Sequence, residues 1–576
     1  MLIFKKIALE FDKTLECVKN IVDMLDSGDT VPFISRYRKE QAGNIDSETL
    51  YELQDRLNYL RNLEKRKQTI KNQMREREQL TPELEKQIDS YEIASQLEEF
   101  YEPFIPREDS PGTKAIEKGL KPLAELIANK GTKDNEIEKM ISKIIEEKNY
   151  SREEIIEGAK DIIYEDIIYD PQIKEKVRNI SKNKAILTTK KINKKNKEEQ
   201  VDTYDKYKDT REDIHKIPSH RVLAMFRGTK EKQLNMNLVV DEERIKNELV
   251  KHYNIGRSSR ITQQIYEELS QDAYINSIKG LIESEIKKEV FEKAEDHAVE
   301  VFCTNLKNLL MQKPVKDKII LGWDPGYATG CKLAVIDKTG NLLGKNIVKV
   351  TPPYNQIDKG KEILHDLVKK YKVEVISIGN GTASKESEIF VVDFIKENPQ
   401  YNLKYVVVSE AGASVYSASA EAKREFPDLD IYYRSAINIA RRLQDPLSEL
   451  VKINPRSLGI GQYQHDINAK KLKQALDRVI TTCVNTVGVD INTASISLLQ
   501  YVSGLNSRTA TNIVEYRDEV GFIKNRKEVR NIKGIGDKTY QQCIGFLRIF
   551  GGDEELDQYF IHPENYSIAK ELQKLI

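Results

Sequence analysis

The apolar residues of this chain change their spacing at Lys318, and this change constrains the fold more than any other feature. Before it, apolar side chains recur at every third or fourth position among Glu and Lys, as at Leu50, Leu53 and Leu57, which predicts amphipathic helices. After it come short β-branched runs such as IILGWD and VEVISIG, which are typical of strands. The chain has 576 residues, far more than the ~150 of one domain. The sequence therefore predicts a mainly helical, multidomain protein with one α/β domain.

Composition restricts where such a chain works. Its 92 basic residues balance 92 acidic ones, and no run of about 18 apolar residues could cross a membrane. The opening MLIFKKIALEF is too short and too charged for a signal peptide. The five cysteines form no CxxC pair, which disfavours a disulfide framework and a cysteine zinc site. We therefore expect a cytoplasmic protein with no membrane partner.

Two features precede the change at Lys318. The stretch from Lys182 to Lys197 holds seven lysines and no acid, a composition that fits either a hairpin touching phosphate or a solvated surface loop. Further along, apolar residues at helical spacing predict one long amphipathic helix that acts as a strut. These residues are Ile282, Ile286, Val290, Ala294, Ala298 and Val301.

Beyond Lys318 the predicted elements follow the order β-β-β-α-β-α-β-α. Three strand-like runs come in quick succession, and helical patterns then cover Asp358 to Tyr371 and Lys385 to Glu397 between further strands. This order predicts a mixed sheet with helices on its faces, as in the ribonuclease H type of fold.

A nuclease of this fold would take its carboxylates from the strand ends. Asp324 ends the first predicted strand and Glu410 a later one, and with Asp445 they are the candidate catalytic set. Two-metal hydrolysis needs several converging carboxylates, yet Asn380 stands where one would be wanted. Asp445 precedes a proline and fits a helix N-cap, and Asp324 also fits a structural role in its DPG turn. The set is incomplete, so we expect no resident metal and no cofactor.

Two glycine hairpins follow, VSGLN at residues 502–506 and IKGIG at 532–536. Each opens a helix whose apolar face begins four residues later, which is the helix-hairpin-helix pattern. Glycine lets a phosphate approach the backbone, and the helix start adds a positive dipole end. Residues 501–550 hold nine Lys or Arg against five acids, an excess of about +4 that suits a nucleic-acid backbone. The alternative is that the glycines only let helices pack. The candidate contact residues are Gly504, Asn506, Arg508, Lys533, Gly534, Gly536 and Lys538.

Long strings along the chain resemble one family. TVPFISRYRKEQAGNIDSETLYEL, HKIPSHRVLAMFRG, LGWDPGYATGCKLAVID, ARRLQDPLSELVKI and GIGQYQHDI are similar to strings of the bacterial Tex family of transcription accessory proteins. The resemblance implies an N-terminal helical region, a YqgF-type ribonuclease H-like domain, helix-hairpin-helix repeats and a C-terminal OB-fold RNA-binding barrel. No run of five short strands follows HPENYSIAKELQKLI. We therefore expect a chain that lacks the barrel, either truncated or naturally short, with the hairpins as its main candidate surface.

Motifs and resemblance together predict five parts. These are a Tex-type N-terminal helical domain at 1–180, a lysine-rich hairpin with long central helices at 181–316, a YqgF-type domain at 317–452, a helix-hairpin-helix domain at 453–552 and a helical tail at 553–576. We expect a non-enzymatic protein that binds RNA or DNA backbone, RNA by preference, beside the transcription machinery, and the resemblance alone implies the transcription part. Two alternatives remain open: a metal-dependent nuclease or resolvase, and a helical scaffold for protein partners.

Overall fold

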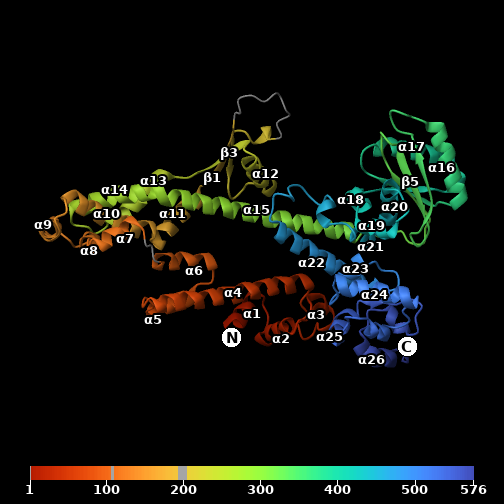
Figure 1. Cartoon of the computed structure of the whole chain (residues 1–576), viewed down its shortest axis with the longest axis horizontal. Helices are drawn as coiled ribbons and strands as arrows, with labels where there is room; N and C mark the ends of the chain where they lie inside the picture. Colours follow the sequence, from red (N-terminus) through yellow and green to blue (C-terminus); the bar gives the residue numbers. More distant parts are fainter. Residues whose placement is uncertain (1, 106–108, 193–203, 576) are drawn as a thin grey trace. The chain divides into compact units, whose positions relative to one another are not determined.

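The computed structural model describes residues 2–105, 109–192 and 204–575. The chain folds as two compact units, one made of Met1–Arg56 with Ala298–Ile576 and the other of Leu57–His297. Helices dominate both units (Figure 1). This confirms the mainly helical, multidomain class, while the five-part division stays a prediction.

The unit of residues 57–297 combines helices with one small sheet. Strands β1 (Ile186–Lys191), β2 (Thr210–Asp213) and β3 (Leu234–Val239) pair antiparallel in the order β2-β1-β3. Of the lysine-rich stretch, residues 186–191 form β1, and residues 193–197 lie outside the described residues. The helices of this unit are α5 (Pro82–Ser90), α6 (Ala94–Tyr101), α7 (Pro111–Glu117), α8 (Lys121–Ala128), α9 (Asp134–Lys148), α10 (Arg152–Ile168), α11 (Pro171–Asn183), α12 (Ser219–Lys230), α13 (Glu242–Asn254) and α14 (Arg260–Ala273).

Two long helices, α4 (Ser47–Glu76) and α15 (Lys279–Leu310), continue from one unit into the other along the chain. The predicted strut is α15, and its apolar positions from Ile282 to Ala298 are buried as expected. Val301 was wrongly placed in that stripe, because it is 40% exposed and Phe302 is buried instead. Phe302 lies four residues after Ala298 and falls on the same face of the helix. Val301 lies three residues after Ala298 and points away from that face here.

The ribonuclease H type of fold is confirmed. Its sheet has the order β6-β5-β4-β7-β8. Strands β4, β7 and β8 are parallel to one another, and β5 is antiparallel to both of its neighbours, β4 and β6. One face packs against α16 and α17, the other against α20 (Figure 1). Trp323 is fully buried against Phe390, as expected of a core residue. The elements are β4 (Ile320–Asp324), β5 (Cys331–Ile336), β6 (Leu342–Val348), α16 (Ile357–Tyr371), β7 (Val375–Gly379), α17 (Ser384–Glu397), β8 (Lys404–Val408), α18 (Ala413–Ser417), α19 (Ala420–Glu425), α20 (Ile431–Gln444) and α21 (Pro446–Leu450).

The N-terminal and C-terminal helices belong to the same unit. In Figure 1 the red α3 lies beside the blue α25, and side-chain hydrogen bonds described below join the two segments. The helices here are α1 (Leu2–Glu10), α2 (Leu15–Asp26), α3 (Val31–Tyr37), α22 (Ala469–Val487), α23 (Ile496–Leu499), α24 (Ser507–Val520), α25 (Asp537–Cys543) and α26 (Tyr566–Gln573), with the short strands β9 (Val489–Asp490) and β10 (Leu547–Arg548).

Candidate nucleic-acid interface

The first hairpin, residues 502–506, is packed inside its unit. Gly504 has a φ of +78°, and a Cβ there would lie 2.6 Å from the Cβ of Gln542, closer than real side chains approach. The neighbouring Ser503 is 3% exposed. This glycine is therefore required for packing against α25, which is the alternative that the sequence left open.

Most backbone amides of the first hairpin already have acceptors. Asn506 caps α24, because its Oδ1 accepts the N–H groups of Arg508 and Thr509, each at 3.0 Å. The N–H of Asn506 itself donates to Thr509 Oγ1 at 2.8 Å, and that of Ser503 to Asn485 Oδ1 at 2.9 Å. A phosphate would have to displace these bonds.

An N-terminal segment covers this hairpin. The N–H of Thr30 donates to Gln542 Oε1 at 2.9 Å, and the Thr30 hydroxyl hydrogen-bonds the hydroxyl of Ser503. Gln542 Nε2 in turn donates to Asp29 Oδ1 at 3.1 Å. The first hairpin thus serves as a docking site for a segment of the same unit.

The second hairpin, residues 532–536, has a different environment. Ile532 and Ile535 are buried and anchor the turn, whereas Gly534 and Gly536 are exposed. Gly534 needs its glycine because its φ is +84°. Gly536 has an ordinary φ of −80°, and a Cβ there would meet nothing within 4 Å. Its outer side is therefore open to solvent.

Several amides of this second turn have no acceptor among the described residues, although those of Ile532 and Ile535 donate to backbone carbonyl oxygens. Gly536 is the N-cap of α25 and offers no side chain to cap it. Among the described residues, no acceptor is found for the N–H groups of Gly534, Gly536 or Lys538. Asn512 Nδ2 donates to the carbonyl oxygen of Lys533 at 2.6 Å and holds the turn against α24. The open amides sit on a fixed backbone, which suits an anion.

Side-chain charges around the turn are mixed. Lys533 and Arg508 are exposed. Lys538 Nζ lies 3.8 Å from Asp29 Oδ1, so its charge is partly neutralised. Asp537 is exposed in the first turn of α25, 3.6 Å from the guanidinium of Arg530. Lys533 is therefore the cation of the turn with the fewest competing contacts.

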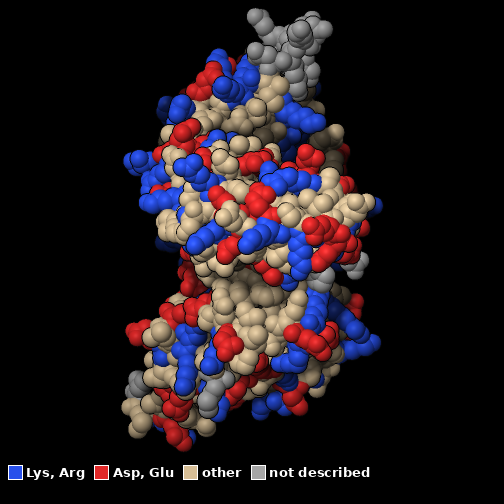
Figure 2. All heavy atoms as spheres, turned by 90° about the vertical axis from the view of Figure 1, so that its left-hand side faces the viewer, with Lys and Arg blue, Asp and Glu red and all other residues tan. Residues whose placement is uncertain are grey.

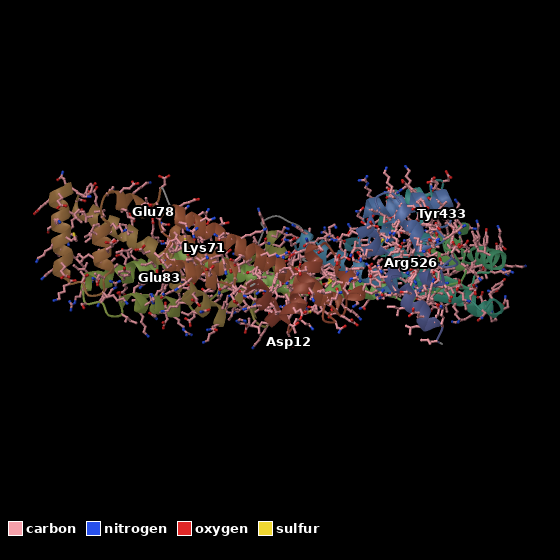
Figure 3. All side chains as sticks on the ribbon, turned by 90° about the horizontal axis from the view of Figure 1, so that it is seen from below. Asp12, Lys71, Glu78, Glu83, Tyr433 and Arg526 are labelled. Atoms are coloured by element: carbon pink, nitrogen blue, oxygen red, sulfur yellow. The ribbon has the colours of Figure 1, made fainter. Side chains whose placement is uncertain are left out.

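Three of the nine cations between residues 501 and 550 serve the fold. The Arg526 side chain is 1% exposed, and its guanidinium donates to three backbone carbonyl oxygens, those of Leu547, Tyr559 and Ile561. Figure 3 labels this residue within the C-terminal helical region. Arg517 donates to two carbonyl oxygens before α23. Arg548 stacks on two phenylalanines. The local charge counted from sequence therefore overstates the charge available to a ligand.

In the ribonuclease H-like domain, Asp324 and Glu410 lie near each other. Burial raises the pKa of Asp324, and a hydrogen bond from Ser435 opposes this. Burial and the nearby Asp324 raise the pKa of Glu410. Gly381 is a further residue of this site that was not predicted. A Cβ there would lie 1.5 Å from Glu410 Oε1, so this glycine makes room for the carboxylate. The signal was present in the GNG turn after β7.

Asp445, the third member of the candidate set, serves as a helix cap, and Asn380 carries no charge. Asp445 caps α21, as the sequence predicts: its Oδ1 accepts the N–H of Ser448 at 3.1 Å and its Oδ2 the Ser448 hydroxyl at 2.8 Å. Asn380 Oδ1 accepts the N–H of Glu410 at 3.1 Å and so orients that residue. Within the described ranges, no group of three or more His, Cys, Asp or Glu is arranged to hold a metal ion.

No helix among residues 2–105, 109–192 and 204–575 is long and apolar enough to span a bilayer. Basic and acidic side chains are interspersed over the face seen in Figure 2, in keeping with the balanced composition.

Comparison with known proteins gives matches along the whole chain. The models of four domain families match: the Tex-like protein N-terminal domain at residues 1–75, the Tex central region-like family at 132–302, the Tex protein YqgF-like domain at 318–444 and the helix-hairpin-helix motif at 484–548.

Relatives of the full chain are also found. The uncharacterized protein YdcI of Bacillus subtilis is 42% identical over 100% of this chain and 79% of its own length. The transcriptional accessory protein Tex of Neisseria gonorrhoeae is 39% identical over 99% of this chain and 75% of its own length. The S1 RNA-binding domain-containing protein 1 of Homo sapiens is 34% identical over 92% of this chain and 54% of its own length. The ribonuclease H-like sheet and the two hairpins lie inside the matched segments. Because these segments and the full-length relatives agree, this chain belongs to the Tex family.

Proposed function

We propose that this chain binds nucleic-acid backbone through its second hairpin and acts as an accessory factor in transcription. The observation that carries the proposal is the exposed turn at Gly534 and Gly536. The N–H groups of these two glycines have no acceptor among the described residues, and Lys533 beside them has no ion-pair partner there. Backbone amides and lysine bind phosphate without reading bases. We therefore expect little discrimination between sequences.

Two relatives support the finer parts of the proposal. The transcription role follows the name of the Neisseria gonorrhoeae relative, transcriptional accessory protein Tex. A preference for RNA follows the name of the human relative, S1 RNA-binding domain-containing protein 1. Together they favour an RNA-contacting partner of the transcription machinery.

We further propose that the ribonuclease H-like domain does not cut nucleic acid. Both carboxylate oxygens of Asp445 are engaged by Ser448, and Asn380 contributes no charge. Two divalent ions need several carboxylates to offset their mutual repulsion. The nearness of Asp324 and Glu410 favours a metal-dependent nuclease as the second candidate.

A binding experiment tests the proposed function. Fluorescence anisotropy with single- and double-stranded RNA and DNA, at several salt concentrations, should show binding that weakens steeply with salt and is tightest for RNA. Random-sequence competitors should compete almost as well as any chosen sequence. Failure to bind any of the four nucleic acids would refute the proposed function.

Cleavage is measured on the same substrates and on four-way junctions with magnesium or manganese. We expect intact substrates, and we expect Asp324→Asn to bind as the wild type does. If the wild type cuts and Asp324→Asn abolishes the cut, the carboxylates are catalytic and the nuclease candidate replaces ours.

A further inference from the structure

The outer face of the β2-β1-β3 sheet has no role in the proposed function. Side chains alternate between the two faces of each strand. On the inner face, Leu187, Thr189 and the alternating residues of β3 are buried, and β3 packs on α12. The outer face carries five basic or uncharged polar residues that are exposed or only partly buried, Thr188, Lys190, Arg211, Asn235 and Asn237, and one acid, Asp213.

The strand register brings these five side chains together. Thr188 pairs with Arg211 on one side and with Asn237 on the other, and Lys190 pairs with Asn235. Directly paired residues have their Cβ atoms about 5 Å apart, and diagonal neighbours such as Lys190 and Arg211 about 7 to 8 Å apart. The face therefore presents two cations within reach of adjacent phosphates on one strand.

Acids border this group, but in the described parts of the chain they do not pair with its two cations. The acidic outer-face residue, Asp213, pairs with Ile186 at the far end of β1 and accepts the N–H of His215 at 2.9 Å. In the described parts of the chain, neither Lys190 nor Arg211 has a carboxylate within ion-pair distance. This differs from cations elsewhere in the unit, such as Arg152, whose guanidinium lies 2.6 Å from Glu138.

We propose that this outer face is a second nucleic-acid contact surface, one that takes phosphates on Lys190 and Arg211 and sugar or phosphate oxygens on Asn235 and Asn237. The Thr188 hydroxyl donates to the carbonyl oxygen of Asn237 at 3.2 Å, so it would accept from a sugar hydroxyl. The inference rests on the proposed function, because it assumes that the chain binds nucleic acid. Two unpaired cations complement phosphate, and amide and hydroxyl side chains are common contacts to sugar and phosphate. An acidic polypeptide would also match the two cations, so the proposed function decides for nucleic acid, and the poly-glutamate measurement below distinguishes the two.

The test compares two double variants of the full chain. Lys190→Ala with Arg211→Ala removes the two face cations. Lys143→Ala with Arg152→Ala removes the same charge from cations whose carboxylate partners, Glu147 and Glu138, lie 3.8 and 2.6 Å away. On single-stranded RNA, each lost phosphate contact lowers the slope of log affinity against log salt by about 0.7. We expect a drop of about 1.4 for the first variant and an unchanged slope for the second.

A photo-crosslinking residue at Asn237 gives a second readout, and we expect it to label bound RNA. Equal slopes for the two double variants, with Gly536→Val still weakening binding, would overturn this inference and leave the hairpin proposal standing. Binding of poly-glutamate that depends on Lys190 and Arg211 while RNA binding does not would also overturn it, in favour of an acidic protein partner. A wild type that binds no nucleic acid would refute the proposed function itself.

Discussion

The two hairpins share one sequence pattern and one fold, yet they face different surroundings. In the first, Gly504 packs on Gln542, Asn506 caps the following helix and residues 29–30 cover the turn. In the second, the turn at Gly536 has neither a cap nor a covering segment among the described residues. The comparison teaches that a glycine pattern fixes the backbone of a hairpin, while partners distant in sequence decide whether its amides are free for a ligand.

The largest expected effect is on the stability of the first hairpin. Gly504→Val places a β-branched residue at a φ of +78° and a Cβ 2.6 Å from that of Gln542. Backbone strain and overpacking should together lower the free energy of unfolding by about 3 kcal/mol. Urea unfolding followed by circular dichroism measures this. An unchanged midpoint would mean that the first hairpin is as open as the second.

Gly536→Val should act on binding instead. Its Cβ meets nothing within 4 Å, so stability should change by less than about 1 kcal/mol. The valine should screen the free amides and weaken RNA binding about tenfold, or about 1.4 kcal/mol. Gly280→Val is a matched control, because that site in α15 is also open and lies outside the hairpins. Equal affinities of the two variants would contradict a role for the second turn.

Removing the cap of the first hairpin should lower stability by about 1 kcal/mol. Asn506→Ala deletes the acceptor of two amides at the start of α24. Since these amides are not part of the proposed contact, RNA affinity should stay within about twofold, or about 0.4 kcal/mol. A tenfold loss of affinity in a folded variant would show that the first hairpin binds RNA.

The smallest effects concern single lysines. Lys533→Ala should lower the salt slope by about 0.7 on single-stranded RNA, the value for one phosphate. Lys538→Ala should lower it less, because Asp29 already lies 3.8 Å from that ammonium. Titrations at four salt concentrations separate the two. A larger drop for Lys538 would place the phosphate on the side of the N-terminal segment.

Local patterns predicted much of the fold. The order of strands and helices after Lys318, the long helix α15, both hairpins and the cap at Asp445 follow from periodicity and turn chemistry. Val301 was misplaced because the stripe of α15 continues at a step of four, and the sequence pattern there allowed either step.

The candidate site was predictable only in part. All seven candidate residues lie in or beside the hairpins. However, the residue pattern around Gly504 is the same as that around Gly534, so the sequence could not show which glycine is packed and which is exposed. That difference depends on Thr30, which lies 473 residues from its partner Ser503. Likewise, Arg526 counts as a free cation in the sequence and is buried among carbonyl oxygens in the fold.

The bond from Thr30 to Gln542, across 512 residues of chain, has a consequence for synthesis. A ribosome that adds about 5 to 20 residues per second makes the partner of Thr30 roughly 25 to 100 s after Thr30 itself. Through that interval the apolar residues of α2 and α3, among them Phe33 and Ile34, have no C-terminal helices to cover them. The apolar surface of α2 and α3 therefore stays open to other contacts, such as those of a chaperone at the ribosome, until residue 542 has been made.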